Sequence, residues 1–457
     1  MTHVLTTPTR RHGRAADRSM ALQSRAAQKS RLGRAMRPGF ATLLLAVLPW
    51  SAPAAGPLKV GDEIIVLADG PGEDVRGTPH VAFGKGMYLA VWREGLNGEG
   101  GRARIFAARL DKQGQALDSR PVEVAPCTDG FQELPRVAFG GGVFLVVWQD
   151  CRNGKDYDVL GARILPEGAV LDSQPIAIAA GPRTQSVPDV ASDGRDFLVA
   201  WQAVQGAENA YRVGAARLDS EGRLGSAAEI MSPWTKAGAC PRIAWDGSNY
   251  RMVFVSQSVL SVRLARDGSP LEQDAVVTLR SHLGAAIRFA HSVAAAPGQG
   301  MLTVFTRSQP DYWGWGGPGA MICLLVGMDG KPDAGIPRED YPQSKLANWL
   351  DFGKDKSEGS PWPYGSSAVA WDGRQFVAVW QRQHIKKTVS LTNSDIIAAR
   401  IDGWRPLDAA GVPVAATELE EKNPAIASAG AGKLLCVYEK HDQDGKVRIV
   451  ARVLESQ

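Results

Sequence analysis

The chain has 457 residues, of which 44% are hydrophobic and 22% charged, with 50 glycines and 28 prolines. This composition excludes a disordered chain, a collagen-like chain and a disulfide-dense miniprotein. The formal net charge is +4, but residues 1–55 carry nine Lys and Arg with one Asp, whereas the remainder carries 43 Lys and Arg against 47 Asp and Glu. The basic charge belongs to the leader, so the acidic body argues against nucleic-acid binding.

The leader has the pattern of a secretory signal peptide. Its apolar run, residues 40–48, follows several arginines and precedes Ala52-Pro53-Ala54, which fits a cleavage site. Met36 is a candidate true start, and no cysteine follows the run to carry a lipid. The run is too short to span a membrane, and no later stretch reaches 18 apolar residues. We therefore expect cleavage near Ala54, no membrane span, and a secreted or periplasmic protein; a disordered basic tail is the alternative.

A repeated unit follows the leader. Residues 79–92 (PHVAFGKGMYLAVW) recur as residues 135–148 (PRVAFGGGVFLVVW) and residues 188–201 (PDVASDGRDFLVAW). Weaker copies end on Phe254, Phe305, Trp380 and Tyr438. The seven closing aromatics are spaced 56, 53, 53, 51, 75 and 58 residues apart. Self-similarity at this period predicts a repeat-built domain.

Each unit predicts four short antiparallel strands. A short run opens the unit, an Asp-Gly or Gly-rich turn such as Asp193-Gly194 follows, and an apolar run such as residues 144–148 comes next. A third run ends on a recurring arginine, as at Arg163, and a tight turn leads to the fourth. Four strands in a unit of this length are typical of a β-propeller blade.

The two ends of the repeat region are complementary. Residues 60–68 (VGDEIIVLA) resemble a fourth strand without the first three, and residues 422–454 supply three strands without a fourth. Pairing them completes seven blades and leaves no open edge. We therefore predict an all-β, monomeric, seven-bladed propeller over residues 56–457, with a β-sandwich array and a β-solenoid as alternatives.

The recurring aromatic and arginine residues are expected to be structural. An aromatic at the end of the second strand fills the space between neighbouring blades. Recurrence of the arginine in six units suits packing better than one active site. We expect these arginines to pair with loop carboxylates such as Asp158.

The units resemble the Trp-Asp-x-Arg…Asp-Ile-x-x-x-Arg repeats of uncharacterised secreted bacterial β-propellers. The second unit carries the resemblance through Trp148-Gln149-Asp150-Cys151-Arg152 and Asp158-Val159-Leu160-Gly161-Ala162-Arg163, and the sixth through Trp380-Gln381-Arg382 and Asp395-Ile396. Ala244-Trp245-Asp246-Gly247 is faintly similar to the repeats of TolB-like propellers. The resemblance implies a fold and a secreted setting, and it transfers no catalytic residue.

The fifth unit carries two long insertions, at about residues 309–318 and 340–364. They should project from the face that holds the variable loops, called the top face here. Their aromatic side chains suggest a ligand platform, with a self-packed blade cap as the alternative. The residues assigned to the platform are Tyr312, Trp313, Trp315, Trp349 and Trp362.

The residue after each blade-opening proline is expected at the top of the central channel. These residues include His80, Arg136, Asp189 and Arg242, with His291 in the equivalent stretch of the fifth unit. The arginines suit a carboxylate or sulfate ligand. Solvated channel-mouth residues without function are the alternative.

Metal and thiol chemistry receive little support. Asp150, Asn153, Asp156 and Asp158 offer oxygen ligands for Ca²⁺, but their spacing matches no EF-hand, so no cofactor and no metal site are assigned. Cys127 and Cys151 are expected to approach each other on the top face, within reach of a disulfide. Cys436 is expected to be a buried free thiol.

The leading hypothesis is a binding module that presents its top face to a glycan or protein through the aromatic platform, Arg136 and Arg242. The alternative is a polysaccharide lyase or glycoside hydrolase at the channel, with His80 or His291 as base, Tyr312 as acid, and Asp189 as the one carboxylate placed there.

Overall fold

The structure is a computed structural model, and it describes residues 56–66, 76–95, 102–127, 130–205, 210–230, 240–255, 258–272, 276–280, 291–306, 321–328, 366–385, 391–403, 405–443 and 445–456. Contacts divide the chain into Met1–Ala54 and Ala55–Gln457, and every described residue belongs to the second unit. The predicted leader and its predicted cleavage site near Ala54 lie outside the described residues. Within the described ranges, no helix is long and apolar enough to cross a membrane.

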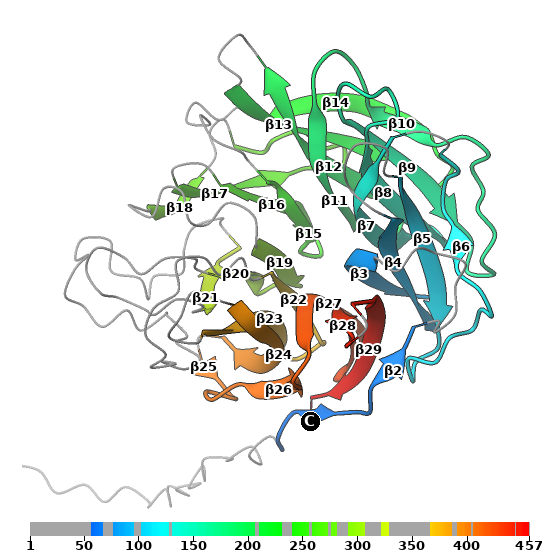
Figure 1. The fold of residues 1–457 in the computed structure, drawn as a ribbon. Coiled ribbons are helices and arrows are strands. Elements are labelled where there is room, and N and C mark those ends of the chain that lie inside the picture. Colours follow the sequence, from blue (N-terminus) through cyan, green and yellow to red (C-terminus); the bar gives the residue numbers. More distant parts are fainter. Residues whose placement is uncertain are drawn as a thin grey trace, which may run out of the picture. The chain divides into compact units, whose positions relative to one another are not determined.

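The described strands form seven antiparallel sheets (Figure 1). The first three sheets are β3 (Arg76–Gly84), β4 (Met87–Gly95), β5 (Ala103–Leu110) and β6 (Val122–Glu123); β7 (Gln132–Gly140), β8 (Val143–Asp150), β9 (Asp158–Ile164) and β10 (Ile176–Ala179); and β11 (Gln185–Ser192), β12 (Phe197–Gln205), β13 (Ala210–Leu218) and β14 (Leu224–Ile230). The fourth and fifth are β15 (Arg242–Trp245), β16 (Tyr250–Val255), β17 (Ser258–Leu264) and β18 (Val276–Arg280); and β19 (His291–Ala296), β20 (Gly300–Thr306) and β21 (Met321–Val326).

The last two sheets complete the set. The sixth holds β22 (Ser367–Trp371), β23 (Phe376–Ile385) and β24 (Leu391–Asp402), with β25 (Arg405–Pro406) and β26 (Val412–Ala415) both on β24. The seventh holds β27 (Glu420–Gly430), β28 (Lys433–His441) and β29 (Val447–Glu455) with β1 (Lys59–Val60) and β2 (Ile64–Ile65). Six sheets have the four strands expected or more. The fifth has three among the described residues, so seven complete blades are not shown.

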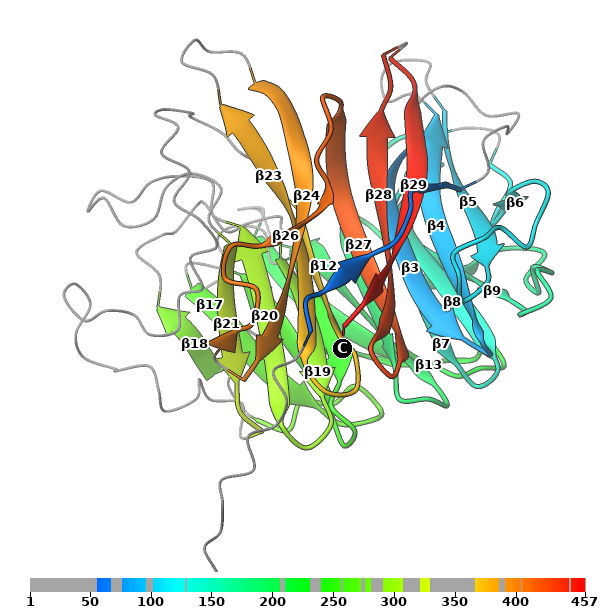
Figure 2. The same cartoon turned by 90° about the horizontal axis from the view of Figure 1, so that it is seen from below.

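The sheets are arranged as in a β-propeller. The first strands of successive sheets contact one another in a closed circle, running β3, β7, β11, β15, β19, β22, β27 and back to β3. Figure 1 shows these strands innermost, and Figure 2 shows the sheets of β27–β29 and β3–β5 standing side by side. Apolar clusters lie between neighbouring sheets, and one joins the first sheet to the seventh through residues such as Trp92 and Leu435.

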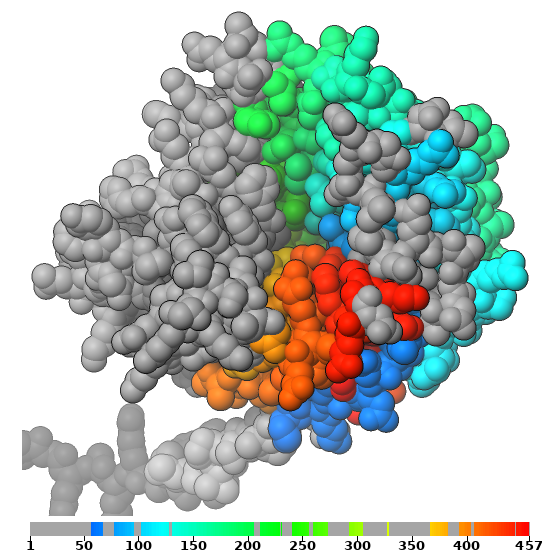
Figure 3. Space-filling view, in the orientation of Figure 1, coloured from blue at the N-terminus to red at the C-terminus, as the bar shows by residue number. Residues whose placement is uncertain are grey.

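The chain ends close the ring as the incomplete units predicted. Lys59 and Val60 pair with Glu455 and Leu454, and Ile64 and Ile65 pair with Ala451 and Val450. In Figure 3 the blue N-terminal segment accordingly lies beside the red C-terminal strands. The outer edge of β29 is thereby covered, which removes a site for edge-to-edge aggregation.

The recurring aromatics fill the spaces between sheets, as expected. Trp92, Trp148 and Trp380 are almost fully buried, and so are Phe254 and Tyr438. The Trp148 indole N–H donates to Asp150 Oδ2 at 2.9 Å, and Arg152 binds the same carboxylate at 2.7 Å. These contacts explain the Trp-x-Asp-x-Arg motif as a rigid structural element.

The recurring arginine is also structural and pairs with loop carboxylates, as predicted, but Asp158 is the wrong example. Arg163 pairs with Asp172 at 2.6 Å, in the turn that follows its strand, and not with Asp158. The first, fourth and sixth units pair in the same way: Arg109 with Asp118, Arg263 with Glu272, and Arg400 with Asp408. Nη1 of Arg163 also donates to the Ser220 carbonyl of the next sheet at 3.0 Å. Each such guanidinium therefore fixes a turn and, where it reaches across, joins two sheets.

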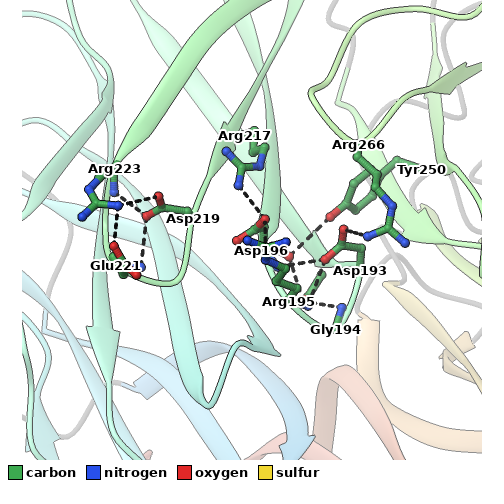
Figure 4. A network of polar contacts seen from close by, with 11 residues as sticks. Asp193, Gly194, Arg195, Asp196, Arg217, Asp219, Glu221, Arg223, Tyr250 and Arg266 are labelled. Atoms are coloured by element: carbon green, nitrogen blue, oxygen red, sulfur yellow. Dashed lines mark hydrogen bonds and ion pairs between the residues drawn. The ribbon is translucent and has the colours of Figure 1, made fainter.

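The third sheet departs from this pattern. Arg217 instead binds Asp196 at 2.6 Å, in the Asp193-Gly194 turn, as Figure 4 shows. In the same turn, Asp193 pairs with Arg266 of the fourth sheet, and the Tyr250 hydroxyl donates to the Asp196 carbonyl at 3.4 Å. Sheets three and four are therefore joined through this turn.

The entry to the innermost strands contains an unusual backbone conformation. The residue before the blade-opening proline has a positive φ in five units: Thr78 (51°), Leu134 (51°), Val187 (51°), Cys240 (38°) and Asn423 (50°). Such values are rare for non-glycine residues, above all for β-branched ones. Register shifts mark bulges at four of these sites, where the proline has no N–H to pair.

A recurring side chain of the preceding sheet holds this conformation. It is the residue directly after the buried aromatic, Gln149, Gln202 or Glu439. Gln149 Oε1 accepts from Val187 N at 3.0 Å, Gln202 Oε1 from Cys240 N at 3.2 Å, and Glu439 Oε1 from Thr78 N at 2.5 Å. Three of the five residues, Thr78, Val187 and Cys240, thus have their N–H satisfied across the boundary between two sheets.

Replacing Gln202 by leucine is expected to reduce the free energy of unfolding by about 1–3 kcal/mol, because the buried N–H of Cys240 loses its acceptor. Gln202→Glu keeps an acceptor oxygen, like the one that Glu439 provides at the equivalent position. Its loss of unfolding free energy should therefore be clearly smaller. Equilibrium unfolding in urea measures both values. Equal stability of Gln202→Leu and the wild type would contradict this role.

Candidate binding site in the central channel

A cavity of about 710 Å³ opens where the innermost strands begin. All seven of these strands contribute residues to its wall. Its volume lies within the range of small-molecule sites, roughly 300–1,000 Å³. Hydroxyl and amide side chains form much of the lining, among them Thr78, Thr184, Ser292, Ser366 and Asn423.

The structure brings four of the predicted channel residues together. His80, Arg136, Asp189 and Arg242 all line this cavity, so their placement after the blade-opening proline predicted their location. His291 begins β19, and only its backbone is described. The predicted platform lies outside the described residues, and it comprises Tyr312, Trp313, Trp315, Trp349 and Trp362.

Three channel residues join neighbouring innermost strands. His80 Nδ1 accepts a hydrogen bond from Val137 N at 3.2 Å. Asp189 Oδ2 accepts from Ile243 N at 2.8 Å, and Ser292 Oγ from Val369 N at 3.3 Å. The equivalent positions in the second and fourth sheets hold Arg136 and Arg242, which carry donors and no acceptor. Acceptors at this position are therefore used within the scaffold, whereas the arginines bring positive charge to the wall.

His80 is a poor candidate for a catalytic base. Burial, followed by the positive charges of Arg136 and Arg242, holds its pKa well below the ordinary value of 6.5, so the ring is neutral. Because Nδ1 accepts from Val137 N, the ring proton is assigned to Nε2. The lone pair of Nδ1 is then used by the hydrogen bond from Val137 N, and Nε2 carries the ring proton. Neither nitrogen has a lone pair left to take a proton from a substrate.

The low pKa of His80 predicts how stability depends on pH. The unfolded chain gains a proton at His80 as the pH falls through about 6.5, whereas the folded chain stays neutral until a lower pH. This contribution to stability is therefore complete above pH 6.5 and declines below it. His80→Asn keeps an acceptor near the Nδ1 position without this titration, so its melting temperature should fall less between pH 7 and pH 5. Parallel curves for the two proteins over this interval would contradict the prediction.

The two arginines and Asp189 set the electrostatics of the cavity. Arg136 Nε lies 3.7 Å from Asp189 Oδ1, and the Nη1 groups of Arg136 and Arg242 donate to the carbonyls of Pro135 and Pro241 at 2.9 and 2.8 Å. Burial and the nearby charge of Arg242 lower the pKa of Arg136 to about 10, and Asp189 opposes this shift only in part. Arg136 therefore stays protonated at neutral pH.

Asp189 does not neutralise both cations. Burial raises the pKa of its carboxyl group, although Arg242, Arg136 and the N–H of Ile243 act in the opposite direction. Among the described residues of the cavity wall, the charged groups are two guanidiniums and one carboxylate. Two positive charges in one cavity wall favour an anion between them. The cavity can therefore bind a singly charged anionic group.

The wall residues that the sequence did not predict include Gln149, Tyr157, Gln202 and Tyr211. The two glutamines share a signal, since each directly follows a recurring aromatic of its unit. Tyr157 directly precedes β9 and Tyr211 lies in β13, and each stands six residues before the recurring arginine of its unit, Arg163 or Arg217. Tyr157 is fixed by a hydrogen bond from its hydroxyl to Glu133 Oε2 at 2.8 Å.

Two of the residues considered for Ca²⁺, Asp150 and Asp158, are engaged in other contacts. Asp150 accepts hydrogen bonds from Trp148 and from Arg152. Burial alone would raise the pKa of Asp150, but these contacts hold it below its usual range. Asp158 Oδ1 accepts from Gly181 N at 3.2 Å. Within the described ranges, no cluster of three His, Cys, Asp or Glu could hold a metal ion.

The cysteines show one expected feature. Cys436 is fully buried and not bridged, as predicted, and burial raises the pKa of its thiol. Cys127 and Cys151 are partly exposed and are not joined by a disulfide in the structure. Their approach therefore stays a prediction.

No protein-family model and no curated protein sequence matches the chain. Among solved structures, it is similar to a protein of unknown function from Dyadobacter fermentans, with 11% identity and a TM-score of 0.45 over 89% of this chain and 100% of the other. It is similar to the Trypanosoma rangeli sialidase, with 10% identity and a TM-score of 0.42 over 74% of this chain and 56% of the other. It is also similar to the β-propeller domain of the Trilobed protease from Pyrococcus furiosus, with 11% identity and a TM-score of 0.38 over 72% of this chain and 82% of the other. Identities this low say nothing about activity.

Proposed function

We propose that this chain is an exported, seven-bladed β-propeller that binds an anionic glycan in the cavity at the top of its central channel. The observation that carries the proposal is the pair Arg136 and Arg242 in the cavity wall, opposed by Asp189 as the one carboxylate among the described wall residues. Guanidinium groups bind carboxylates and sulfates through paired, charge-assisted hydrogen bonds. The signal-like leader supports the exported location.

The neutral part of the wall supports a sugar as the ligand. Ser, Thr, Asn and Gln side chains share the cavity wall with the arginines, and such groups can donate or accept hydrogen bonds. Sugar hydroxyls require partners of both kinds. A cavity that combines these groups with excess positive charge fits an acidic sugar better than an apolar ligand.

Binding is favoured over hydrolysis by the carboxylate count. A glycoside hydrolase of the usual type needs two carboxyl groups on either side of the scissile bond. Asp189 is the one carboxylate among the described wall residues, and it already accepts from Ile243 N. With His80 also committed, the described wall provides no acid–base pair.

Titration calorimetry with trigalacturonate and with neutral galactotriose tests this function. We expect binding of the acidic trimer that weakens as salt is added, and much weaker binding of the neutral one. Equal affinities for the two trimers, or no binding of any anionic oligosaccharide, would refute the proposal.

A further inference from the structure

Two tyrosines stand at one sector of the cavity mouth, between the second and third sheets. Tyr157 precedes β9, and Tyr211 is the second residue of β13. Both line the cavity and both are half-buried. The same wall carries Arg136 and Asp189 on the innermost strands of these two sheets. The aromatic rings and the charged groups therefore border one continuous space.

The backbone fixes how far apart the tyrosines lie. The Tyr157 carbonyl accepts from Gln185 N at 2.7 Å, and the Thr184 carbonyl accepts from Val204 N at 2.9 Å. Val204 in turn pairs with Tyr211 across β12 and β13. Two backbone segments thus separate the tyrosines, which places their backbones about 14 Å apart at the usual strand spacing. One sugar ring is too small to stack on both.

Tyr157 is held rigidly at this position. Its hydroxyl donates to Glu133 Oε2 at 2.8 Å, and Gln149 Nε2 donates to the same oxygen at 3.1 Å. Gln149 is itself fixed by the N–H of Val187 at the entry to β11. An aromatic ring whose hydroxyl is already held by a hydrogen bond loses little conformational entropy when a ligand stacks on it.

We propose that Tyr157 and Tyr211 are stacking platforms for two sugar rings of an oligosaccharide whose anionic unit enters the cavity at Arg136 and Arg242. This inference rests on the proposed function and names its ligand class, a short chain of pyranose rings with a singly charged unit. The charge is supplied by a uronate or by a sulfate ester, since both suit a guanidinium. The ligand then extends from the channel outward over the second and third sheets.

The test compares Tyr157→Ala and Tyr211→Ala with the wild type, using trigalacturonate, galacturonate monomer, sulfated galactotriose and tri-glutamate. Each alanine variant should bind the acidic trimer about 5- to 10-fold more weakly, because a stacked ring is lost. The monomer, which reaches only the arginines, should keep its affinity. Tyr157→Phe retains the ring and should stay within about threefold of the wild type for the trimer. Melting temperatures establish that each variant is folded.

The outcomes separate this inference from the function on which it rests. Tighter binding of trigalacturonate identifies a uronate, and tighter binding of the sulfated trimer identifies a sulfate ester; either result supports the inference. It is overturned if both alanine variants bind the trimer as the wild type does, or if tri-glutamate binds as tightly as the acidic sugars. In those cases the anion-binding function stands. Failure of the wild type to bind any anionic probe refutes the function itself.

Discussion

Replacing Arg136 and Arg242 together by glutamine is expected to weaken the binding of an anionic oligosaccharide by about 100-fold or more. Charge-assisted hydrogen bonds contribute roughly 1.5–3 kcal/mol each, and the double variant removes two sources of them. It also reverses the sign of the cavity charge, because Asp189 then remains as the charged wall residue among those described. Calorimetry with trigalacturonate measures the loss, and each single variant should show an intermediate effect.

Arg104→Gln is the matched control for this experiment. Arg104 forms an ion pair with Glu123 at 3.2 Å, its side chain is 45% exposed, and it is not part of the cavity wall. Its replacement removes one positive charge from the surface and should leave affinity nearly unchanged. Affinity of the double variant within about threefold of the wild type would show that the arginines are channel residues without a ligand role.

Replacing Arg400 by leucine is expected to cause a large loss of stability, about 3–5 kcal/mol. Its guanidinium binds Asp408 at 2.8 Å, and the two side chains are only 3% and 9% exposed. Nη1 also donates to the Gly56 carbonyl at 2.6 Å, just before the strands that close the ring. The variant leaves a buried carboxylate without its partner and releases the N-terminal segment. Urea unfolding monitored by tryptophan fluorescence measures the loss.

The size of this effect depends on burial, which a second variant can test. Arg104→Leu breaks an exposed ion pair of similar chemistry, with side chains 45% and 31% exposed, and should cost less than about 1 kcal/mol. A loss of similar size in both variants would contradict the structural role assigned to the repeated arginines. If Arg400→Leu also aggregates more readily, the exposed edge of β29 explains it.

Much of the fold could be predicted because the repeat makes each unit support the others. The closing aromatics located the second strands, and the incomplete ends predicted the pairing of β1 and β2 with β29. The blade-opening proline gave a fixed reference point in each unit. Because equivalent positions share one location in a circular array, the residues that follow it, such as Arg136 and Asp189, were correctly placed around one cavity.

The remaining features depend on contacts that a single unit does not contain. Asp172 was missed as the partner of Arg163 because a tight turn brings it back over the strand, whereas Asp158 only appears close in sequence. The positive φ of Val187 is stabilised by Gln149 of the preceding sheet, a pairing visible only in three dimensions. Tyr157 and Tyr211 hold the same place in two units, six residues before the recurring arginine, but a repeated position does not by itself show that it faces the cavity.

The most direct test of the central claim is a crystal structure of the chain grown with trigalacturonate. We expect electron density for the sugar in the central cavity, with a carboxylate within hydrogen-bonding distance of the guanidinium groups of Arg136 and Arg242, about 2.7–2.9 Å. Trigalacturonate bound on another surface, with the cavity holding only solvent, would contradict it.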